Sequence, residues 1–158
     1  MKKDLTFDDI EKYYSKKHLN EFIIGHLAIE TILNQLIEIK LIKPNNLDKL
    51  NLSFNQKIEL LFSMDLFSDK MVEFLKCINS YRNKFAHDIN FNLDFQLAFN
   101  LVNIAATAGI DFSDDGIYNN KQWSQENYNV EGIVDELFRN TIIDLGFLLE
   151  ELGGSSIF

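Results

Sequence analysis

An all-α fold, a helical bundle of four to six helices with an up-and-down core, is predicted by three features of the sequence. The chain of 158 residues is 46% hydrophobic and contains fourteen Phe, which is enough apolar material for one sizeable core. Pro44 is the only proline and Gly occurs seven times, and scarce helix breakers favour long helices over tight turns. Apolar residues also recur every three or four positions. Because no repeat and no linker divides the chain, we expect a single domain over residues 1–158.

The first long helix is expected from about Thr6 to Leu41, with a break near Ser15. Thr6 has the side chain of an N-cap residue, and two aspartates follow it in the first turn, where negative charge suits the helix dipole. Apolar residues form two flanks of this helix: Phe22, Ile23, Leu27, Leu33, Leu36 and Ile37 on one, and Ile24, Ile29 and Ile32 on the other. The helix should therefore be buried on two sides, and it should stop at Pro44.

Three more helices are expected between about residues 53 and 108. Ser53 caps a short helix, and Ser68 caps a longer one whose apolar positions reach Phe85. The next helix runs from about Asp94 to Ala108.

The C-terminal part of the sequence differs from the rest in charge. Residues 1–90 hold 13 Lys+Arg and 13 Asp+Glu, whereas residues 91–158 hold 2 and 11, so all of the net charge of −9 lies there. The composition of residues 110–130 predicts an ordered loop or insertion. Trp123 in this segment either contacts a partner or fills the inside of the loop. An acidic amphipathic helix follows over residues 130–152 and ends at two glycines. This charge distribution excludes a broad polyanion-binding face but allows a local basic site in the first part.

We expect a soluble, cytoplasmic protein. Cys77 is the only cysteine, so the chain has no internal disulfide. Lys2 and Lys3 are followed by acidic and polar residues, which is unlike a signal peptide. No apolar run approaches the roughly 18 residues that span a bilayer, so no membrane partner is expected.

The segment Arg82-Asn83-Lys84-Phe85-Ala86-His87 carries the candidate chemistry. Imidazole exchanges protons near neutral pH, so His87 is suited to act as a general base or acid. The guanidinium of Arg82 matches phosphate oxygens with paired donors, and the amide of Asn83 suits a hydroxyl or phosphate oxygen. Together these groups suit RNA cleavage without a metal or cofactor, in which a 2′-hydroxyl attacks the neighbouring phosphorus. Lys84 supports the site by making it locally basic.

The spacing of these residues sets a geometric condition. Asn83 and His87 are four residues apart and share a helix face, whereas Arg82 and His87 are roughly 140° apart around a regular helix. Arg82 and His87 therefore meet only if the helix ends or bends there, or if a second subunit supplies the missing partner. This condition predicts a homodimer.

Glu30 is a polar residue on the otherwise apolar first helix. We expect it to meet a cation, either Arg82 or another, as a structural pair or as a device that orients the site. His26 lies four residues before Glu30, but no third protein ligand for a zinc ion can be named. A core or surface histidine is therefore the favoured interpretation of His26, and we expect no metal.

The spacing of an Arg, a following polar residue and a His resembles the hallmark of the HEPN superfamily. The resemblance extends to LSFNQKIEL at residues 52–60, MDLF at 64–67 and INSYRNKFAHD at 78–88, which look like a bacterial HEPN subgroup. HLAIE at residues 26–30 is similar to the first helix of that subgroup. The similarity covers roughly residues 18–90.

This resemblance implies a dimeric bundle of four to five helices that is often an endoribonuclease of a toxin–antitoxin or phage-defence system. It implies that Arg82, Asn83 and His87 are the catalytic positions, that RNA is the substrate, and that an antitoxin or defence-system protein is a further partner. Some members are controlled by modification of a Tyr two residues after the His, where this chain has Ile89.

Two other interpretations remain open. In one, the chain is a non-catalytic binding or regulatory protein that resembles mannitol-operon-repressor-like proteins. Arg82 and His87 would then complement a helix dipole, and Asn83 would bond the backbone. In the other, the acidic C-terminal region covers the site until a partner moves it.

Overall fold

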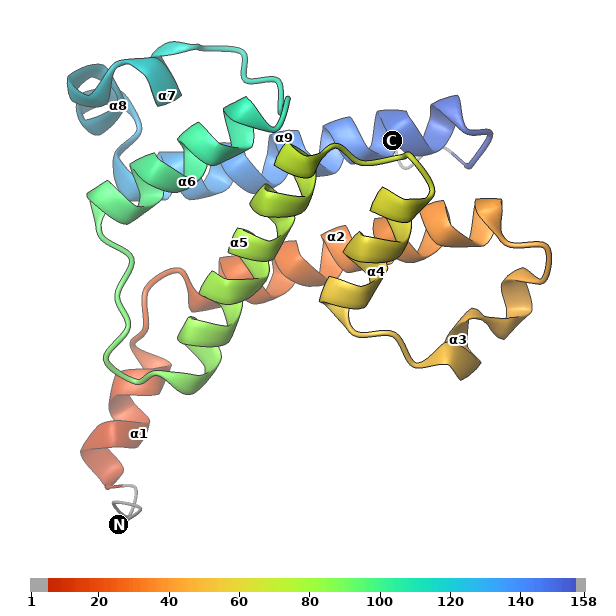
Figure 1. Cartoon of the computed structure of the whole chain (residues 1–158). Coiled ribbons are helices and arrows are strands. Elements are labelled where there is room, and N and C mark those ends of the chain that lie inside the picture. The colour runs from red at the N-terminus through yellow and green to blue at the C-terminus, as the bar shows by residue number, and fades with distance from the viewer. Residues whose placement is uncertain (1–5, 156–158) are drawn as a thin grey trace.

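Nine α-helices and one short 3₁₀ helix build residues 6–155, the part of the chain that this computed structural model describes (Figure 1). They are α1 (Phe7–Tyr14), α2 (Leu19–Lys40), η1 (Pro44–Asn46), α3 (Leu47–Leu50), α4 (Phe54–Ser63), α5 (Asp69–His87), α6 (Phe95–Thr107), α7 (Gly116–Asn119), α8 (Lys121–Asn127) and α9 (Asn129–Glu151). No strand occurs among these residues, so the predicted all-α class is confirmed. Four α-helices shorter than ten residues, α1, α3, α7 and α8, bring the number of α-helices described above the expected four to six. Lys2 and Lys3, on which the expected absence of a signal peptide rests, lie outside the described residues.

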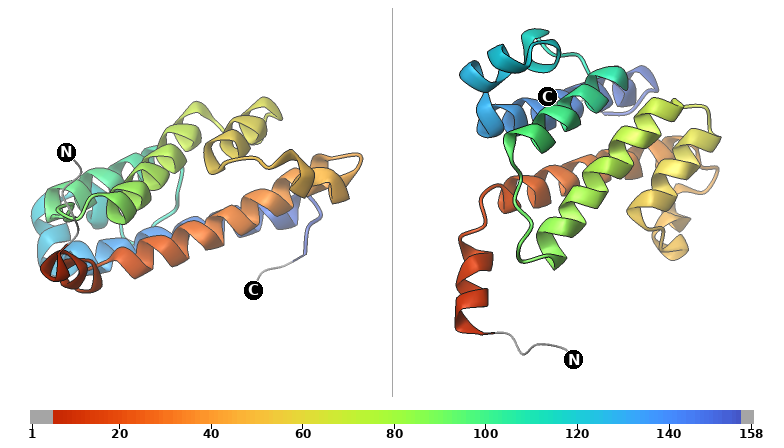
Figure 2. Two further views of the ribbon diagram at one scale, coloured as in Figure 1. Left: turned by 90° about the horizontal axis from the view of Figure 1, so that it is seen from below. Right: turned by 60° about the vertical axis from the view of Figure 1, so that its left-hand side comes forward.

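Two layers of helices enclose the core. α2 and α9 lie side by side in one layer, and α4, α5 and α6 lie across them in the other (Figure 2). α4 and α5 form an antiparallel pair, and α5 also packs on α2 and α6 (Figure 1). α1 projects from the bundle, and none of its residues is buried.

Aromatic rings join the two layers at their centre. The ring of Phe22 in α2 lies 4.9 Å from that of Phe85 in α5 and 5.0 Å from that of Phe138 in α9, measured between centroids. Phe22 and Phe85 are fully buried. Burial of such a side chain stabilises the fold by about 1.5–3 kcal/mol, so this cluster strongly favours one arrangement of α2, α5 and α9.

Three helices begin after the expected N-cap residues Thr6, Ser53 and Ser68, and α6 begins after Asp94, whose capping role was not predicted. Thr6, Ser53, Ser68 and Asp94 each accept a hydrogen bond from the backbone N–H three residues on, at distances of 3.2, 3.3, 3.2 and 2.9 Å. Each bond satisfies an N–H that has no partner inside the helix. The expected break near Ser15 is also present, since Ser15 ends α1.

α2 is the central helix of the bundle and contacts α4, α5 and α9. It is the one helix among the described residues that is long and apolar enough to cross a membrane by length and composition, with a mean hydropathy of 1.4 over 18 residues. The expectation that no apolar run approaches this length is therefore wrong. Ile24 and Leu27, expected in the core, are 67% and 54% exposed, whereas Ile29 and Leu33 are fully buried. Within that 18-residue window, 44% of α2 is buried inside the structure.

Residues 110–130, expected to form a loop, contain the short helices α7 and α8. Asp114 holds them together, because its carboxylate accepts hydrogen bonds from Trp123 Nε1 at 3.0 Å, Tyr128 OH at 2.8 Å and the backbone N–H of Gly116 at 2.8 Å. These donors, with that of Trp123 the strongest, hold the pKa of Asp114 below its usual value. Trp123 packs on Gly116 and is 46% exposed, so it closes this segment without being fully buried.

We predict that Gly25→Ala destabilises the protein by about 1–3 kcal/mol, although Ala favours helices. A Cβ atom at Gly25 would lie 2.2 Å from the packed ring of Phe138, so α2 and α9 would have to separate. Urea unfolding followed by circular dichroism measures the change. Adding Phe138→Leu should recover part of the loss, and a Gly25→Ala variant as stable as the wild type would contradict the close packing of α2 on α9.

Candidate functional site

α5 has one apolar face and one polar face. Its apolar face is buried against α2, α4 and α6 through Phe74, Leu75, Ile78, Tyr81 and Phe85. Its polar face lines an open hollow of about 480 Å³, which we call the α5 hollow, together with one residue of α4 and the residue after α5. The lining residues are Asn55, Lys76, Asn79, Ser80, Asn83, Lys84, His87 and Asp88.

The structure places three of the predicted site residues in this hollow. Asn83 and His87 lie one turn apart on α5, and His87 is the exposed last residue of that helix. Lys84 also lines the hollow, with its ammonium 5.4 Å from the ring centre of Tyr81 and 5.7 Å from that of Phe91. A proton-transfer group, an amide and a cation are therefore present on one helix face.

Arg82 does not line the hollow. α5 is helical throughout from Asp69 to His87, so Arg82 points roughly 140° away from His87 around the helix axis. Its Nη1 donates to Asn83 Oδ1 at 3.1 Å, and its Nε is buried without a hydrogen-bond partner. Neither a bend nor a helix end brings Arg82 to His87, so their convergence requires a second subunit.

Lys16 holds the end of α5, a contact that the sequence analysis missed. Its ammonium donates to the backbone carbonyl of Phe85 at 3.0 Å and to that of Asp88. Burial lowers the pKa of Lys16, while the charge of Asp88 acts in the opposite direction. The cation lies where the helix dipole is negative, so it stabilises the turn that carries His87.

The partner of Glu30 is Lys57 of α4, with 2.6 Å between Nζ and Oε1. The expectation of a cationic partner is confirmed, and the cation is not Arg82. The side chains of Lys57 and Glu30 are only 12% and 26% exposed. This ion pair ties α2 to α4 and leaves Arg82 without a carboxylate from Glu30.

His26 is a core histidine, 5% exposed and stacked on Phe54 with ring centroids 4.1 Å apart. Burial lowers its pKa, opposed by its bond to Asn79 and the charge of Glu30, and reinforced by Arg82 and Lys57. The imidazole is therefore neutral at neutral pH. Among the described residues, no group of three or more His, Cys, Asp or Glu is placed to hold a metal ion.

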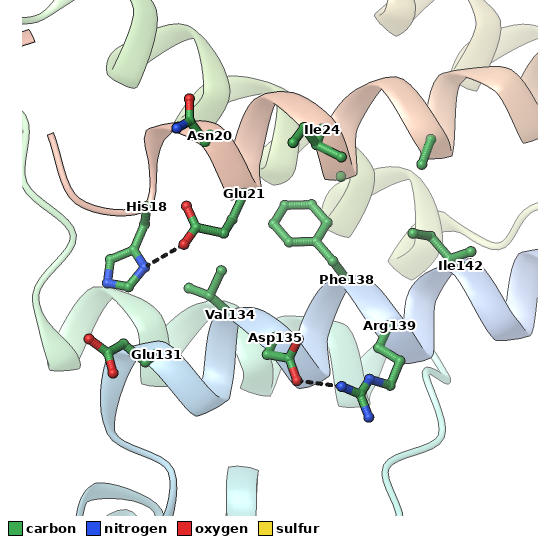
Figure 3. A pocket seen from close by; sticks show the side chains of 12 residues that line it. His18, Asn20, Glu21, Ile24, Glu131, Val134, Asp135, Phe138, Arg139 and Ile142 are labelled. Carbon is green, nitrogen blue, oxygen red and sulfur yellow. Dashed lines mark hydrogen bonds and ion pairs between the residues drawn. The ribbon is translucent and has the colours of Figure 1, made fainter. Parts of the chain in front are cut away.

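A second cavity, of about 430 Å³, lies between α2 and α9 (Figure 3). Phe138 and Ile24 form part of its apolar wall, and its rim carries the contact of His18 with Glu21 and the ion pair of Asp135 with Arg139. The acidic helix α9 packs on α2 and α6, and none of the residues described after Asp88 lines the α5 hollow.

Comparisons with protein-family models, with curated proteins and with solved structures find no match to this chain. The all-α bundle therefore rests on the structure alone. Membership of the HEPN superfamily stays a prediction from the residues of the motif and the segments around it.

We predict that the free energy of unfolding falls as the pH is lowered from about 7.5 to 5.5, in part because of His26. Its pKa is lowered in the folded protein, so below about pH 6.5 the unfolded chain takes up a proton that the folded protein excludes. The contribution is at most about 1.4 kcal/mol per pH unit. Urea unfolding at several pH values should show a smaller slope for His26→Gln, in which the other histidines are unchanged. Equal slopes for both proteins would refute the assignment.

Proposed function

We propose that this protein is a metal-independent endoribonuclease of the HEPN type, soluble and cytoplasmic, that acts in a bacterial toxin–antitoxin or phage-defence system. The observation that supports it most is the shared position of Asn83 and His87 in the α5 hollow, with Lys84 beside them. Arg82 adjoins this site through its bond to Asn83. An antitoxin or defence-system protein would be the regulatory partner.

The proposed reaction is an internal phosphoryl transfer. His87 takes the proton of a 2′-hydroxyl, the 2′-oxygen forms a bond to phosphorus, and the bond from phosphorus to the 5′-oxygen breaks. A proton is delivered to the leaving 5′-oxygen by an imidazolium, and a 2′,3′-cyclic phosphate remains. Arg82 stabilises the charge of the pentacoordinate phosphate, and Asn83 holds an oxygen of the substrate.

This reaction requires a homodimer, because Arg82 and His87 of one chain point in different directions. A twofold axis beside the hollow would bring Arg82 of one subunit to His87 of the other, and a twofold contact supplies each such pair twice. The guanidinium carries five N–H donors, and its bond from Nη1 to Asn83 uses one of them, so the other N–H groups of its terminal nitrogens are left for a phosphate.

The alternative function is that of a non-catalytic binding or regulatory protein of the same fold. The position of Arg82 outside the hollow is the observation that favours it, since a guanidinium bonded to Asn83 also has a purely structural role. In that case, the exposed polar face of α5 would recognise a partner without cleaving it.

We predict that the purified protein, mixed with single-stranded RNA in the presence of a chelator, produces fragments with 2′,3′-cyclic phosphate ends. His87→Ala should lower the rate by at least about 100-fold, because general acid–base catalysis contributes 10²–10⁴-fold. Gel electrophoresis and end-group analysis measure the products, and Asn45→Ala, at an exposed position of η1, serves as the control. Cleavage that persists in His87→Ala would refute the assignment.

Growth of bacteria that express the protein separates the two functions. We expect the wild type to slow growth and Arg82→Ala to restore it at equal protein levels. Equal and harmless expression of both proteins would favour the non-catalytic alternative.

A further inference from the structure

A chain of hydrogen bonds connects the core to the wall of the α5 hollow. His26 Nε2 lies 2.9 Å from Asn79 Oδ1, and Asn79 Nδ2 donates to Asn55 Oδ1 at 3.1 Å. Asn79 and Asn55 line the hollow, whereas His26 is buried and does not line it. The stack of the imidazole on Phe54 holds the first member of the chain in place.

The hydrogen bonds that link His26, Asn79 and Asn55 all donate in the same direction. In the orientation that the structure gives the two amides, Asn79 Oδ1 faces His26 Nε2 and Asn79 Nδ2 donates to Asn55 Oδ1. With this orientation the proton lies on His26 Nε2, and both bonds donate from the core toward the hollow. Asn55 uses its oxygen to accept from Asn79, so its NH₂ group is the outermost donor of the chain. Hydrogen bonds in series polarise one another, which strengthens this last donor.

The groups around this donor suit an anionic oxygen. Ser80, Lys76 and Lys84 line the same hollow, and the ammonium of Lys76 is paired with Glu59 of α4. Asp88 is the only carboxylate among the lining residues, and it lies at the opposite end of α5 from the α4 side. A ligand group that accepts hydrogen bonds therefore fits the α4 side of the hollow better than one that donates.

We propose that Asn55 binds a phosphate oxygen of the RNA strand next to the phosphate cleaved at His87, and that His26 is a positioning residue that orients Asn79 and Asn55 for this contact. The identity of the ligand rests on the proposed ribonuclease function, whereas the direction of the donors does not. Free phosphate offers the same oxygen chemistry, so the experiment must separate the two sources.

The test uses the ¹⁵N-labelled full chain and two ligands: a single-stranded RNA with 2′-O-methyl riboses, which lacks the attacking hydroxyl, and inorganic phosphate. We expect the RNA to shift the side-chain NH₂ signals of Asn55 and Asn79. RNA binding that leaves both signals unchanged overturns the subsite and spares the ribonuclease proposal. Shifts caused by phosphate alone support an anion subsite and overturn RNA as its ligand. No shift with either ligand overturns the inference.

Variants test the role of His26. Asn55→Ala should weaken binding of the 2′-O-methyl RNA about threefold to tenfold, as expected for one lost hydrogen bond. His26→Phe keeps a ring against Phe54 but loses the donor, and it should weaken binding by a similar factor. His26→Gln retains an N–H donor and should bind more tightly than His26→Phe.

A double variant separates positioning from general damage to the fold. If His26 acts through Asn55, then His26→Phe combined with Asn55→Ala should bind RNA no more weakly than Asn55→Ala alone. Losses that multiply in the double variant would overturn the positioning role. Asn45→Ala is the matched control for an exposed asparagine outside the hollow.

Discussion

The orientation of α5 about its own axis, fixed by the burial of its apolar face, determines which of its polar residues line the hollow. Phe74, Ile78 and Phe85 are fully buried, and a turn of the helix that exposed them would cost about 1.5–3 kcal/mol for each ring or aliphatic side chain. Their burial directs Asn83 and His87 into the hollow. It equally directs Arg82 away from His87, so the core that positions two members of the motif excludes the third.

The position of Arg82 outside the hollow carries a free-energy cost, because its Nε is buried. A buried donor without a partner costs about 1–3 kcal/mol, and proteins rarely keep such a group without a reason. Glu30, the nearest carboxylate expected for it, is bonded to Lys57 instead. The guanidinium is thus held close to Asn83 by its Nη1 bond, and its Nε stays buried beside the core.

The features that the sequence predicted correctly are local ones. A hydroxyl at an N-cap bonds a backbone N–H three residues away, so Thr6 and Ser68 could be assigned without knowledge of the fold. The polar face of α5 also follows from a period of 3.6 residues. The sequence could therefore predict that Asn83 and His87 share one face of α5 and that Arg82 lies on a different face.

The features that the sequence did not reveal depend on contacts between distant segments. Lys16 and the end of α5 are about seventy residues apart, and no periodicity connects them. The polar residues of α7 and α8 carry a weak helical signal, and a single carboxylate, Asp114, joins them through Trp123 and Tyr128. Ile24 and Leu27 have apolar side chains on an exposed face of α2, and composition alone cannot distinguish that face from the buried one.

The two histidines near α5 show how burial assigns different roles to the same side chain. His26 is enclosed by Phe54 and its pKa is lowered, so it remains a neutral donor with a fixed partner over the physiological pH range. His87 is exposed at the hollow, at the end of a helix, where solvent can reach it. A group that orients neighbouring amides must not change its protonation state, whereas a general acid or base must. For this reason we propose the buried histidine as a support of the site and the exposed one as the residue of its chemistry.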